Sequence, residues 1–493
     1  MSIWKYSASE LSECIQRKQV SVSEVADEVL RQIEKREDNL HCYITFDKEW
    51  LYKQAQEIQE HVNKGRLQSP LVGVPIAIKD NICVKDLPTT CGSKMLSSFY
   101  STYDATVIRR LKQAGALLVG KTNMDEFAMG STTETSFFGV TKNPHYPEYV
   151  PGGSSGGSAA AVTAKECFMA LGTDTGGSVR QPASHCGIVG LKPTYGRVSR
   201  YGLVAYASSM DQIGPMARTV EDAWVLFHTI AGYDAKDSTS TAGNGMDYTN
   251  MKNAINNRLA AGNMREIRIG IPKEYFQDGL QEDVKYAVLL AAKELEKAGA
   301  TVEEFSLGIT DEVAAYYVLA MAEASSNLAR YDGVKYGYRT NDYEGLDDLY
   351  KKSRAEGFGE EVKRRILMGT YVLQTGYYDA YYQKALTVRR QMEKLYQEAF
   401  RKYDVILGPT APTTAPLLGS SLQQPLQMYM NDLYTVGANL TKIPAISIPC
   451  GTDSKGLPIG LQLQAKEFEE EKLMQVAYAY EKLRNSNRTG GTC

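Results

Sequence analysis

Apolar residues near the start of the chain recur at the spacing of an α-helix. Between residues 1 and 37 the run Val22, Val25, Val29 and Ile33 repeats every three to four positions, which would place these side chains on one helical face. Two pairs, Ser7 with Glu10 and Ser21 with Glu24, have the spacing of a capping box at a helix start. The pattern predicts two amphipathic helices that pack or dock and carry no chemistry.

Short apolar runs then alternate with helical stretches. The runs have the length and composition of buried strands, at Val72–Ile78, Ala116–Val119, Ile267–Ile271, Val405–Leu407, Ala445–Ile448 and Ile459–Leu463. Helical spacing appears at residues 105–114, 157–168, 283–298 and 469–483. The alternation predicts an α/β fold with a central mixed β-sheet covered by helices.

Two regions depart from this alternation. Residues 130–215 are rich in glycine, serine and threonine although they lie between predicted strands, and small residues let backbone amides approach a ligand closely. Residues 310–400 are rich in tyrosine and helical in pattern, so we expect them to cap a site. We interpret residues 1–493 as a single domain that includes N-terminal helices in residues 1–60 and this helical cap region.

Composition restricts the location and the partners. The net charge is −3, so we expect any RNA to be bound mainly by a partner subunit. The 8 cysteines include no CxxC pair, which makes a zinc site or a disulfide framework unexpected and fits a reducing cytoplasm. We therefore expect no metal and no cofactor in this chain. There is no apolar run of 18 residues and no apolar signal core at the N-terminus, so we expect no membrane association.

Two motifs match a nucleotide-binding or hydrolase pattern by letter only. Residues 115–122 satisfy the P-loop pattern, but the residues between its glycines read as a strand where a P-loop needs a flexible turn. Residues 152–156 satisfy G-x-S-x-G, but the preceding Tyr146–Pro151 contains two prolines where a nucleophile elbow needs a buried strand. Both interpretations are rejected.

Three other segments together suggest amide hydrolysis. In residues 73–80 (GVPIAIKD), Lys79 ends an apolar strand, and burial would lower its pKa enough for it to act as a general base. Residues 151–161 (PGGSSGGSAAA) place serine hydroxyls at the start of an alanine-rich helix. In residues 172–180 (GTDTGGSVR), small residues precede a serine, and their amides can converge on an oxyanion. Taken alone, each segment is weak evidence. The structural alternatives are a strand-end lysine for residues 73–80, a helix cap for residues 151–161, where it is the favoured interpretation, and a glycine-rich turn for residues 172–180.

In their order and spacing the three segments resemble the amidase signature family, which implies an amidase-signature fold with helices on both faces of the sheet. The resemblance makes Ser178 the nucleophile, Ser154 a bridging serine that follows a cis peptide bond, and Lys79 the base. It also assigns the oxyanion hole to the backbone amides of Thr175, Gly176 and Gly177, together with that of Ser178.

Further segments resemble the A subunits of glutamyl-tRNA(Gln) amidotransferases, and this likeness covers nearly the whole chain. The segments are residues 121–134, 208–215, 356–366 and 376–382. By this resemblance Arg365 would bind the carboxylate of glutamine and Asp432 its ammonium group, while Tyr316 would line the pocket. From the residues alone, the preferred interpretation is structural for all three residues, with Arg365 a surface charge on a helix and Asp432 a helix cap.

The resemblance implies a glutaminase subunit in a heterotrimer with subunits B and C. The chain would hydrolyse glutamine and supply ammonia for converting Glu-tRNA(Gln) to Gln-tRNA(Gln), with ATP and magnesium bound by the partner subunit. The alternatives are a stand-alone serine amidase acting on small amides and a non-catalytic binding protein on the same scaffold. The presence of Lys79, Ser154 and Ser178 argues against the last of these.

Overall fold

A single mixed sheet organises the computed structural model, which describes residues 3–241, 264–308, 311–422 and 425–489. Within these residues the sheet has 11 strands in the order β1-β3-β2-β4-β6-β5-β10-β11-β9-β7-β8. The strands are β1 (Tyr43–Phe46), β2 (Pro75–Lys79), β3 (Leu117–Thr122), β4 (Met169–Asp174), β5 (Val189–Lys192), β6 (Gln212–Ala217), β7 (Arg268–Pro272), β8 (Thr301–Phe305), β9 (Val405–Pro409), β10 (Ala445–Thr452) and β11 (Pro458–Ala465).

Strand directions are mixed, as predicted. Strand β2 runs parallel to β3 and β4, and β7 runs parallel to β8 and β9. Antiparallel pairing joins these two groups through β6, β5, β10 and β11. The parallel pairs β2–β3 and β2–β4 bring the carboxyl ends of the three strands to one edge, where ligand sites of open α/β sheets occur.

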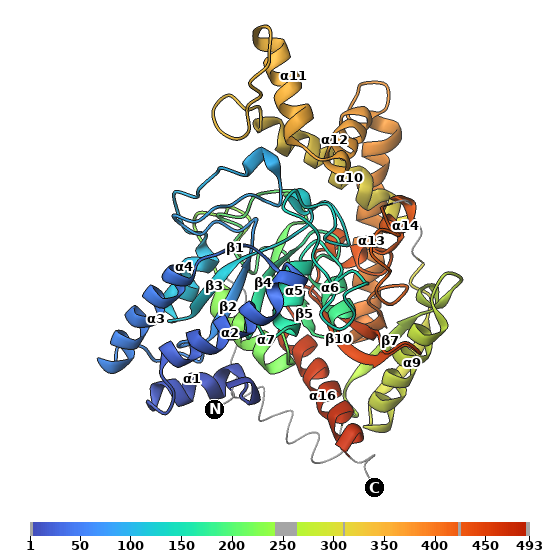
Figure 1. The fold of residues 1–493 in the computed structure, drawn as a ribbon. Helices are drawn as coiled ribbons and strands as arrows, with labels where there is room; N and C mark the ends of the chain where they lie inside the picture. Colours follow the sequence, from blue (N-terminus) through green and yellow to red (C-terminus); the bar gives the residue numbers. More distant parts are fainter. Residues whose placement is uncertain (1–2, 242–263, 309–310, 423–424, 490–493) are drawn as a thin grey trace.

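Helices cover both faces of the sheet (Figure 1). Helices α5 and α6 pack together on one face, and α7, α16 and α9 pack together on the other. The helices are α1 (Ala8–Gln16), α2 (Val22–Leu40), α3 (Lys48–Asn63), α4 (Thr106–Gln113), α5 (Gly156–Thr163), α6 (Arg180–Cys186), α7 (Val220–Ile230), α9 (Glu282–Lys297), α10 (Glu312–Asn327), α11 (Gly345–Gly357), α12 (Glu360–Val372), α13 (Lys384–Lys402), α14 (Pro425–Met430), α15 (Val436–Leu440) and α16 (Glu470–Thr489), with a π-helix at Tyr378–Gln383.

The N-terminal helices begin where the capping pattern predicts. The hydroxyl of Ser7 accepts a hydrogen bond from the Glu10 amide, and that of Ser21 accepts one from the Glu24 amide. In both cases the serine amide donates to the glutamate carboxylate in return, which completes the capping box. The buried side chains of α2 include all four apolar residues of the predicted stripe, from Val22 to Ile33.

Neither of the two rejected motifs has the local structure that its function requires. Residues Leu117–Thr122 form the buried strand β3, so the P-loop pattern contains no phosphate-binding turn. Residues 146–151 lead into the serine segment with only an isolated β-bridge at Tyr149, not a buried strand. All six predicted strands are present, with ends shifted by up to four residues.

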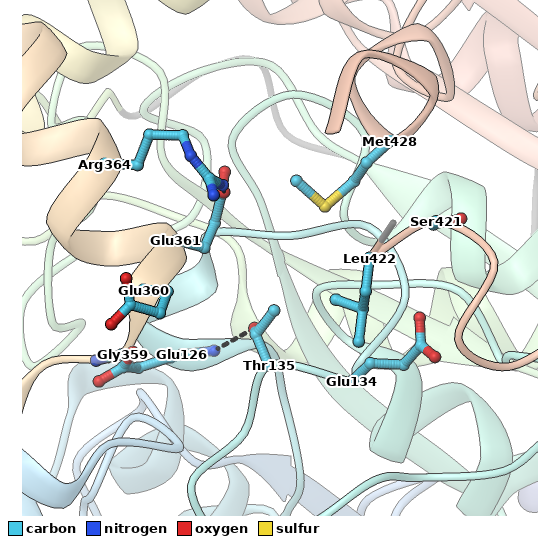
Figure 2. A pocket seen from close by; sticks show the side chains of 10 residues that line it. All are labelled: Glu126, Glu134, Thr135, Gly359, Glu360, Glu361, Arg364, Ser421, Leu422 and Met428. Atoms are coloured by element: carbon cyan, nitrogen blue, oxygen red, sulfur yellow. Dashed lines mark hydrogen bonds and ion pairs between the residues drawn. The ribbon is translucent and has the colours of Figure 1, made fainter. Parts of the chain in front are cut away.

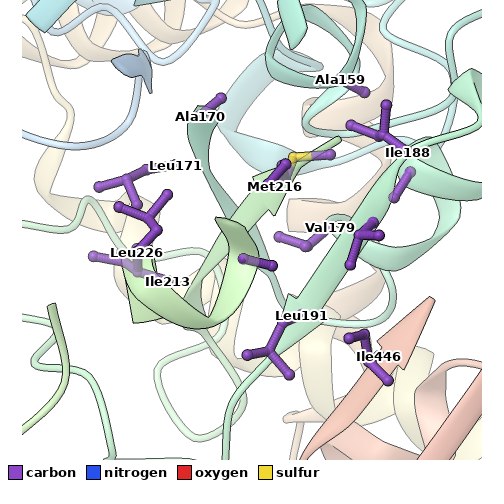
Figure 3. Close-up of a cluster of buried hydrophobic side chains, with 14 of the residues drawn as sticks. Ala159, Ala170, Leu171, Val179, Ile188, Leu191, Ile213, Met216, Leu226 and Ile446 are labelled. Carbon is purple, nitrogen blue, oxygen red and sulfur yellow. The ribbon is translucent and has the colours of Figure 1, made fainter. Parts of the chain in front are cut away.

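An apolar core fills the space behind the glycine-rich segments (Figure 3). It joins Ala159 of α5, Leu171 of β4, Val179, Met216 of β6 and Ile446 of β10, all fully buried. Burying an apolar side chain of this size contributes about 1.5–3 kcal/mol. The serine segments therefore rest on a rigid part of the molecule.

The region predicted to be a cap is helical. Helices α10, α11 and α12 lie together on the side of the molecule opposite the N-terminal helices (Figure 1), and α10 packs against α12 and α13. Among the described residues, no helix combines the length and the apolar character that crossing a bilayer would require.

Candidate active site

Lys79 lies at the carboxyl end of β2, a strand in which every residue is buried. Its Nζ is 2.8 Å from the hydroxyl oxygens of Ser154, Ser155 and Thr173. The side chain is 0% exposed. The predicted base and the predicted bridging serine are thus in direct contact.

Burial lowers the pKa of Lys79 to about 7. The opposing influence comes from the charges of three buried carboxylates, Asp125, Asp174 and Asp211. A lysine with a pKa near 7 is partly neutral at physiological pH, and the neutral amine has the lone pair that a general base needs.

Ser154 follows a cis peptide bond from Gly153, as the family resemblance implied. The Gly153 amide donates to Oε1 of Gln181 over 2.9 Å, and the Ser154 carbonyl accepts from the Asp125 amide over 3.3 Å. A Cβ atom at Gly153 would lie 2.1 Å from Oδ2 of Asp125. Glycine is therefore required here, because the turn is pressed against that carboxylate.

Ser178 lies in the segment between β4 and α6 and is 9% exposed. Its carbonyl accepts a hydrogen bond of 3.2 Å from the Ser155 amide, which holds the segment beside Ser154. Among the described residues, no hydrogen bond joins the hydroxyls of Ser178 and Ser154. The structure thus brings the two serine segments together through their main chains.

A buried ion pair fixes the turn that carries Ser178. Arg180 donates from Nε and Nη2 to the Asp174 carboxylate at 3.0 and 2.9 Å, and both residues are fully buried. Although burial alone would raise it, the pKa of Asp174 is lowered to about 2, mainly by the charge and hydrogen bonds of Arg180. Asp174 also accepts from the amides of Gly177 and Val179, one on each side of Ser178.

One predicted donor of the oxyanion hole has a partner within the protein. The amide of Gly177 donates to Oδ1 of Asp174 over 2.9 Å and so shapes the turn in this structure. The amides of Thr175, Gly176 and Ser178 remain predicted donors. The position of Gly176 has no room for a side chain, because a Cβ atom there would lie 2.4 Å from the ring of Tyr316.

Arg365 is on α12 and only 3% exposed, so it is not a surface charge. Its Nε donates to Glu361 over 2.7 Å and its Nη1 donates to the hydroxyl of Tyr206 over 2.8 Å. The rings of Tyr206, Tyr317 and Tyr429 lie within cation–π distance of the guanidinium, at 5.7, 5.4 and 5.6 Å.

Asp432 faces the same group of tyrosines. Its Oδ2 accepts a hydrogen bond of 2.6 Å from the hydroxyl of Tyr317, the ring that also contacts Arg365. Burial raises the pKa of Asp432 to about 7, against the effects of Tyr317 and Arg365. Tyr316 stacks edge-to-face on Tyr317 with ring centroids 5.0 Å apart. The predicted substrate residues are therefore brought together, and Tyr316 connects them to Gly176 beside Ser178.

Comparison with known proteins identifies the family of this chain. The model of the Amidase family matches residues 24–474. The chain belongs to the amidase family.

Two of the relatives of this amidase, both glutamyl-tRNA(Gln) amidotransferase A subunits, match along nearly their full length. The protein of Lachnospira eligens is 57% identical, over 98% of this chain and 99% of the relative. The protein of Geobacillus thermodenitrificans is 52% identical, over 98% of each chain. Among solved structures, the A subunit from Thermotoga maritima superposes with a TM-score of 0.77 at 39% identity, over 98% of this chain and 94% of that one.

An acidic cavity of about 340 Å³ lies beside α12 (Figure 2). Its walls include Glu126, Glu134 and Glu360, as well as Glu361, which pairs with Arg365. Burial raises the pKa of Glu126 to about 7 and also raises that of Glu134. Their neutral forms are thus favoured, and the carboxylate of this wall that pairs with Arg365 is Glu361.

Several site residues were not predicted from the sequence, among them Glu361, Asp174 and Tyr317. Glu361 had a usable signal, since it stands four residues before Arg365 on a helical segment, the spacing of an intrahelical ion pair. Asp174 lay within the quoted GTDTGGSVR segment, but its partners could not be inferred. Tyr317 had no signal apart from its neighbour Tyr316.

Proposed function

We propose that this amidase is the glutamine-hydrolysing subunit of a tRNA-dependent amidotransferase, which releases ammonia for the conversion of Glu-tRNA(Gln) to Gln-tRNA(Gln). One observation carries the chemistry: the buried Nζ of Lys79 lies 2.8 Å from the hydroxyl of Ser154. The names of the relatives supply the substrate and the reaction.

In the proposed mechanism, neutral Lys79 accepts the proton of Ser154, and Ser154 accepts the proton of Ser178. The Oγ of Ser178 then attacks the side-chain amide carbon of glutamine. The amides of Thr175, Gly176 and Ser178 stabilise the resulting oxyanion. One such donor typically contributes roughly 3 kcal/mol to the transition state.

The tetrahedral intermediate collapses when the C–N bond breaks. The leaving nitrogen takes a proton that returns from the Lys79 ammonium through Ser154, so ammonia departs and a glutamyl ester of Ser178 remains. Water then attacks this ester, again with Lys79 as base, and glutamate is released. Each cycle restores both serines and neutral Lys79.

Recognition of glutamine rests on opposite charges at its two ends. In the proposal Arg365 pairs with the α-carboxylate and Asp432 with the α-ammonium, because buried ionic groups need partners. Glu361 already balances Arg365 at 2.7 Å. A glutamine carboxylate would therefore have to use the guanidinium edge that Glu361 and Tyr206 leave open.

The division of labour in the complex is part of the proposal. Subunits B and C would complete a heterotrimer, and the B subunit would hold ATP, magnesium and most of the tRNA contacts. The net charge of −3 supports this, because such a chain offers no general attraction to RNA phosphates. We place the complex in the cytoplasm, where tRNA is charged.

The domain organisation is proposed on the same basis. One sheet includes strands from Tyr43 to Ala465, which supports a single domain for residues 1–493. Helices α10 and α12 would cap the site, since they carry Tyr316 and Arg365.

The decisive experiment compares the purified chain with the reconstituted three-subunit complex. We expect glutamine-dependent formation of Gln-tRNA(Gln) in the complex. We also expect ammonia to be released faster from glutamine than from aryl or short aliphatic amides. Efficient hydrolysis of small amides by the chain alone, with glutamine a poor substrate in both preparations, would instead establish a stand-alone serine amidase.

A further inference from the structure

A second group of reactive side chains lies away from the amide-hydrolysing site. Glu37 is in the last turns of α2, Cys42 stands just before β1, and Glu166 is in the turn between α5 and β4. One donor atom from each residue lies within 4.8 Å of the other two. Cys42 and Glu166 are fully buried, while Glu37 is half-buried at the edge of the group.

Glu166 is the least satisfied member of this group. Its side chain is 0% exposed, yet neither carboxylate oxygen has a hydrogen-bond partner among the described residues. Burial and the Glu37 carboxylate raise its pKa, while the nearby Cys42 thiol and the charge of Arg36 lower it. None of these groups forms a hydrogen bond of normal distance and angle to either oxygen. Burying a carboxylate without partners is costly, so a charged or protonated group has to compensate it.

Glu37 is held in a different way. Its two carboxylate oxygens accept hydrogen bonds from the backbone amides of Cys42, over 2.8 Å, and Tyr43, over 2.7 Å. Both bonds favour the ionised carboxylate and fix its position at the start of β1. An oriented carboxylate, a thiol and an unpartnered second carboxylate thus meet at one point.

We propose that Glu37, Cys42 and Glu166 bind a divalent cation, with zinc as the expected ion. Thiolate and carboxylate together are a donor set that zinc accepts, whereas calcium and magnesium prefer oxygen alone. Donor atoms around tetrahedral zinc are about 3.3–3.6 Å apart, given bond lengths of about 2.0–2.3 Å. Small side-chain rotations would close the observed group to that size, and a water molecule would complete the coordination.

The competing arrangement is a proton shared between the two glutamates. Burial and the Glu37 carboxylate raise the pKa of Glu166 to about 9, and burial raises that of the Cys42 thiol well above its usual range. A shared proton would satisfy the glutamates without any use of the thiol. The convergence of all three donors favours the metal, which would displace these protons and bind more tightly as pH rises.

A metal at this site would stabilise the fold and would take no part in amide hydrolysis. Helix α5 has 8 residues, so Glu166 is about 12 Å along its axis from the end that carries Ser155. Zinc would tie the end of α2 and the start of β1 to the turn that leads into β4. Removal of the metal should therefore change stability more than glutaminase turnover.

The test uses the full chain at pH 8, first stripped of metal by a chelator and then incubated with Zn²⁺ and desalted. We expect elemental analysis to find about one more zinc ion per chain in the wild type than in each of the site variants Glu37→Gln, Cys42→Ser and Glu166→Gln. Glu34→Gln, on the same helix, and Cys14→Ser, on α1, are the matched controls and should keep the wild-type content. Zinc should raise the Tm of the stripped wild-type chain by about 3–5 °C.

Cobalt gives a readout that requires no variant to fold. Co²⁺ added to the stripped wild-type chain should give the near-ultraviolet absorption of a thiolate–cobalt bond, and Cys42→Ser should lose it. A wild-type chain that retains no zinc, shows no change in Tm and gives no cobalt absorption would overturn the proposal and leave the shared proton. Zinc that persists in all three folded site variants would place the metal elsewhere and also overturn it.

Discussion

The two halves of the proposed active site are built on different principles. Lys79, Ser154 and Ser178 project from a strand end and two glycine-rich segments that rest on the fully buried core of the sheet. Arg365, Asp432 and Tyr316 come from the cap helix α12, the segment after α14 and the cap helix α10, and tyrosine rings join them. In the hydrolytic half, glycine-rich main chain is held by main-chain hydrogen bonds and by the buried Arg180–Asp174 ion pair, whereas the recognition half is held by side chains that contact one another across helices.

This difference determines how charge is handled. In the hydrolytic half, burial suppresses the charge of Lys79, whose pKa is lowered to about 7. In the recognition half, the charge of Arg365 is kept and balanced by Glu361. A base must be neutral to accept a proton, while a carboxylate-binding residue must stay charged, so one site needs both environments.

Loss of the nucleophile should give the largest effect. Ser178→Ala should lower glutaminase activity on the order of 10⁴-fold or more, because no other hydroxyl can form the acyl-enzyme. The reconstituted complex should still use free ammonia at the wild-type rate, which controls for folding and assembly. Trapping with a glutamine-like electrophile, followed by peptide mapping, should find the label on Ser178; a label on Ser154 or a cysteine would refute the assignment.

Changes at Lys79 should be nearly as severe and should reveal its charge state. Lys79→Arg keeps a positive charge that cannot be lost, so we expect both it and Lys79→Ala to be inactive if the neutral amine is the base. Protonation of Lys79 as pH falls through about 7 removes the base, so kcat should fall about tenfold per pH unit below that value. Substantial activity in Lys79→Arg, or a kcat that is flat down to pH 5.5, would mean that a charged lysine only orients the serines.

The hydrolytic half was far easier to predict from the sequence than the recognition half. Lys79, Ser154 and Ser178 each lie in a short segment whose composition follows from its own local structure. Gly153, for example, has to be glycine because a Cβ atom there would clash with Asp125. The engagement of the Gly177 amide by Asp174 was missed, because a run of small residues does not specify which amides turn inward. The roles of Glu361 and Tyr317 depend on contacts between distant segments, which no local pattern encodes.

The same reasoning explains which parts of the fold were predicted. Strands with apolar runs, such as β2 and β9, were found because burial on both faces leaves a continuous apolar signal. Strands β1, β4, β5, β6 and β8 were not predicted. Of these, β4 contains the glycine and polar residues of the site, and β8 is a partly exposed edge strand with two glutamates.

In the recognition half we expect effects on KM more than on kcat. Arg365→Ala and Asp432→Ala should each raise the glutamine KM by about 30–1,000-fold, equivalent to about 2–4 kcal/mol, because each leaves an opposite charge without its partner. Arg364→Ala is the matched control, since this neighbour on α12 is exposed and pairs with the same glutamate. It should change KM less than about threefold. Unchanged kinetics in both site variants would return Arg365 and Asp432 to structural roles.

The smallest predicted effect isolates one hydroxyl group. Tyr317→Phe removes the 2.6 Å hydrogen bond to Asp432 but keeps the ring that contacts Arg365. That bond favours the ionised carboxylate, so its loss should raise the pKa of Asp432 above about 7. Because only the ionised form binds the glutamine ammonium group, KM rises as pH falls through this pKa, and the variant should show the rise at higher pH.

Saturating glutamine separates this effect from the titration of Lys79, since kcat reports the enzyme–substrate complex. We expect Tyr317→Phe to raise KM by about 5–30-fold near pH 7, corresponding to about 1–2 kcal/mol for one hydrogen bond to a charged group, with kcat and its acid limb unchanged. Tyr429→Phe, which removes the hydroxyl contact to Glu361, should leave the pH dependence of KM where it is in the wild type. If Tyr317→Phe also leaves the pH dependence of KM unchanged, the rise of KM at low pH reports the protonation of a group other than Asp432. The contact between Tyr317 and Asp432 would then have no part in glutamine binding.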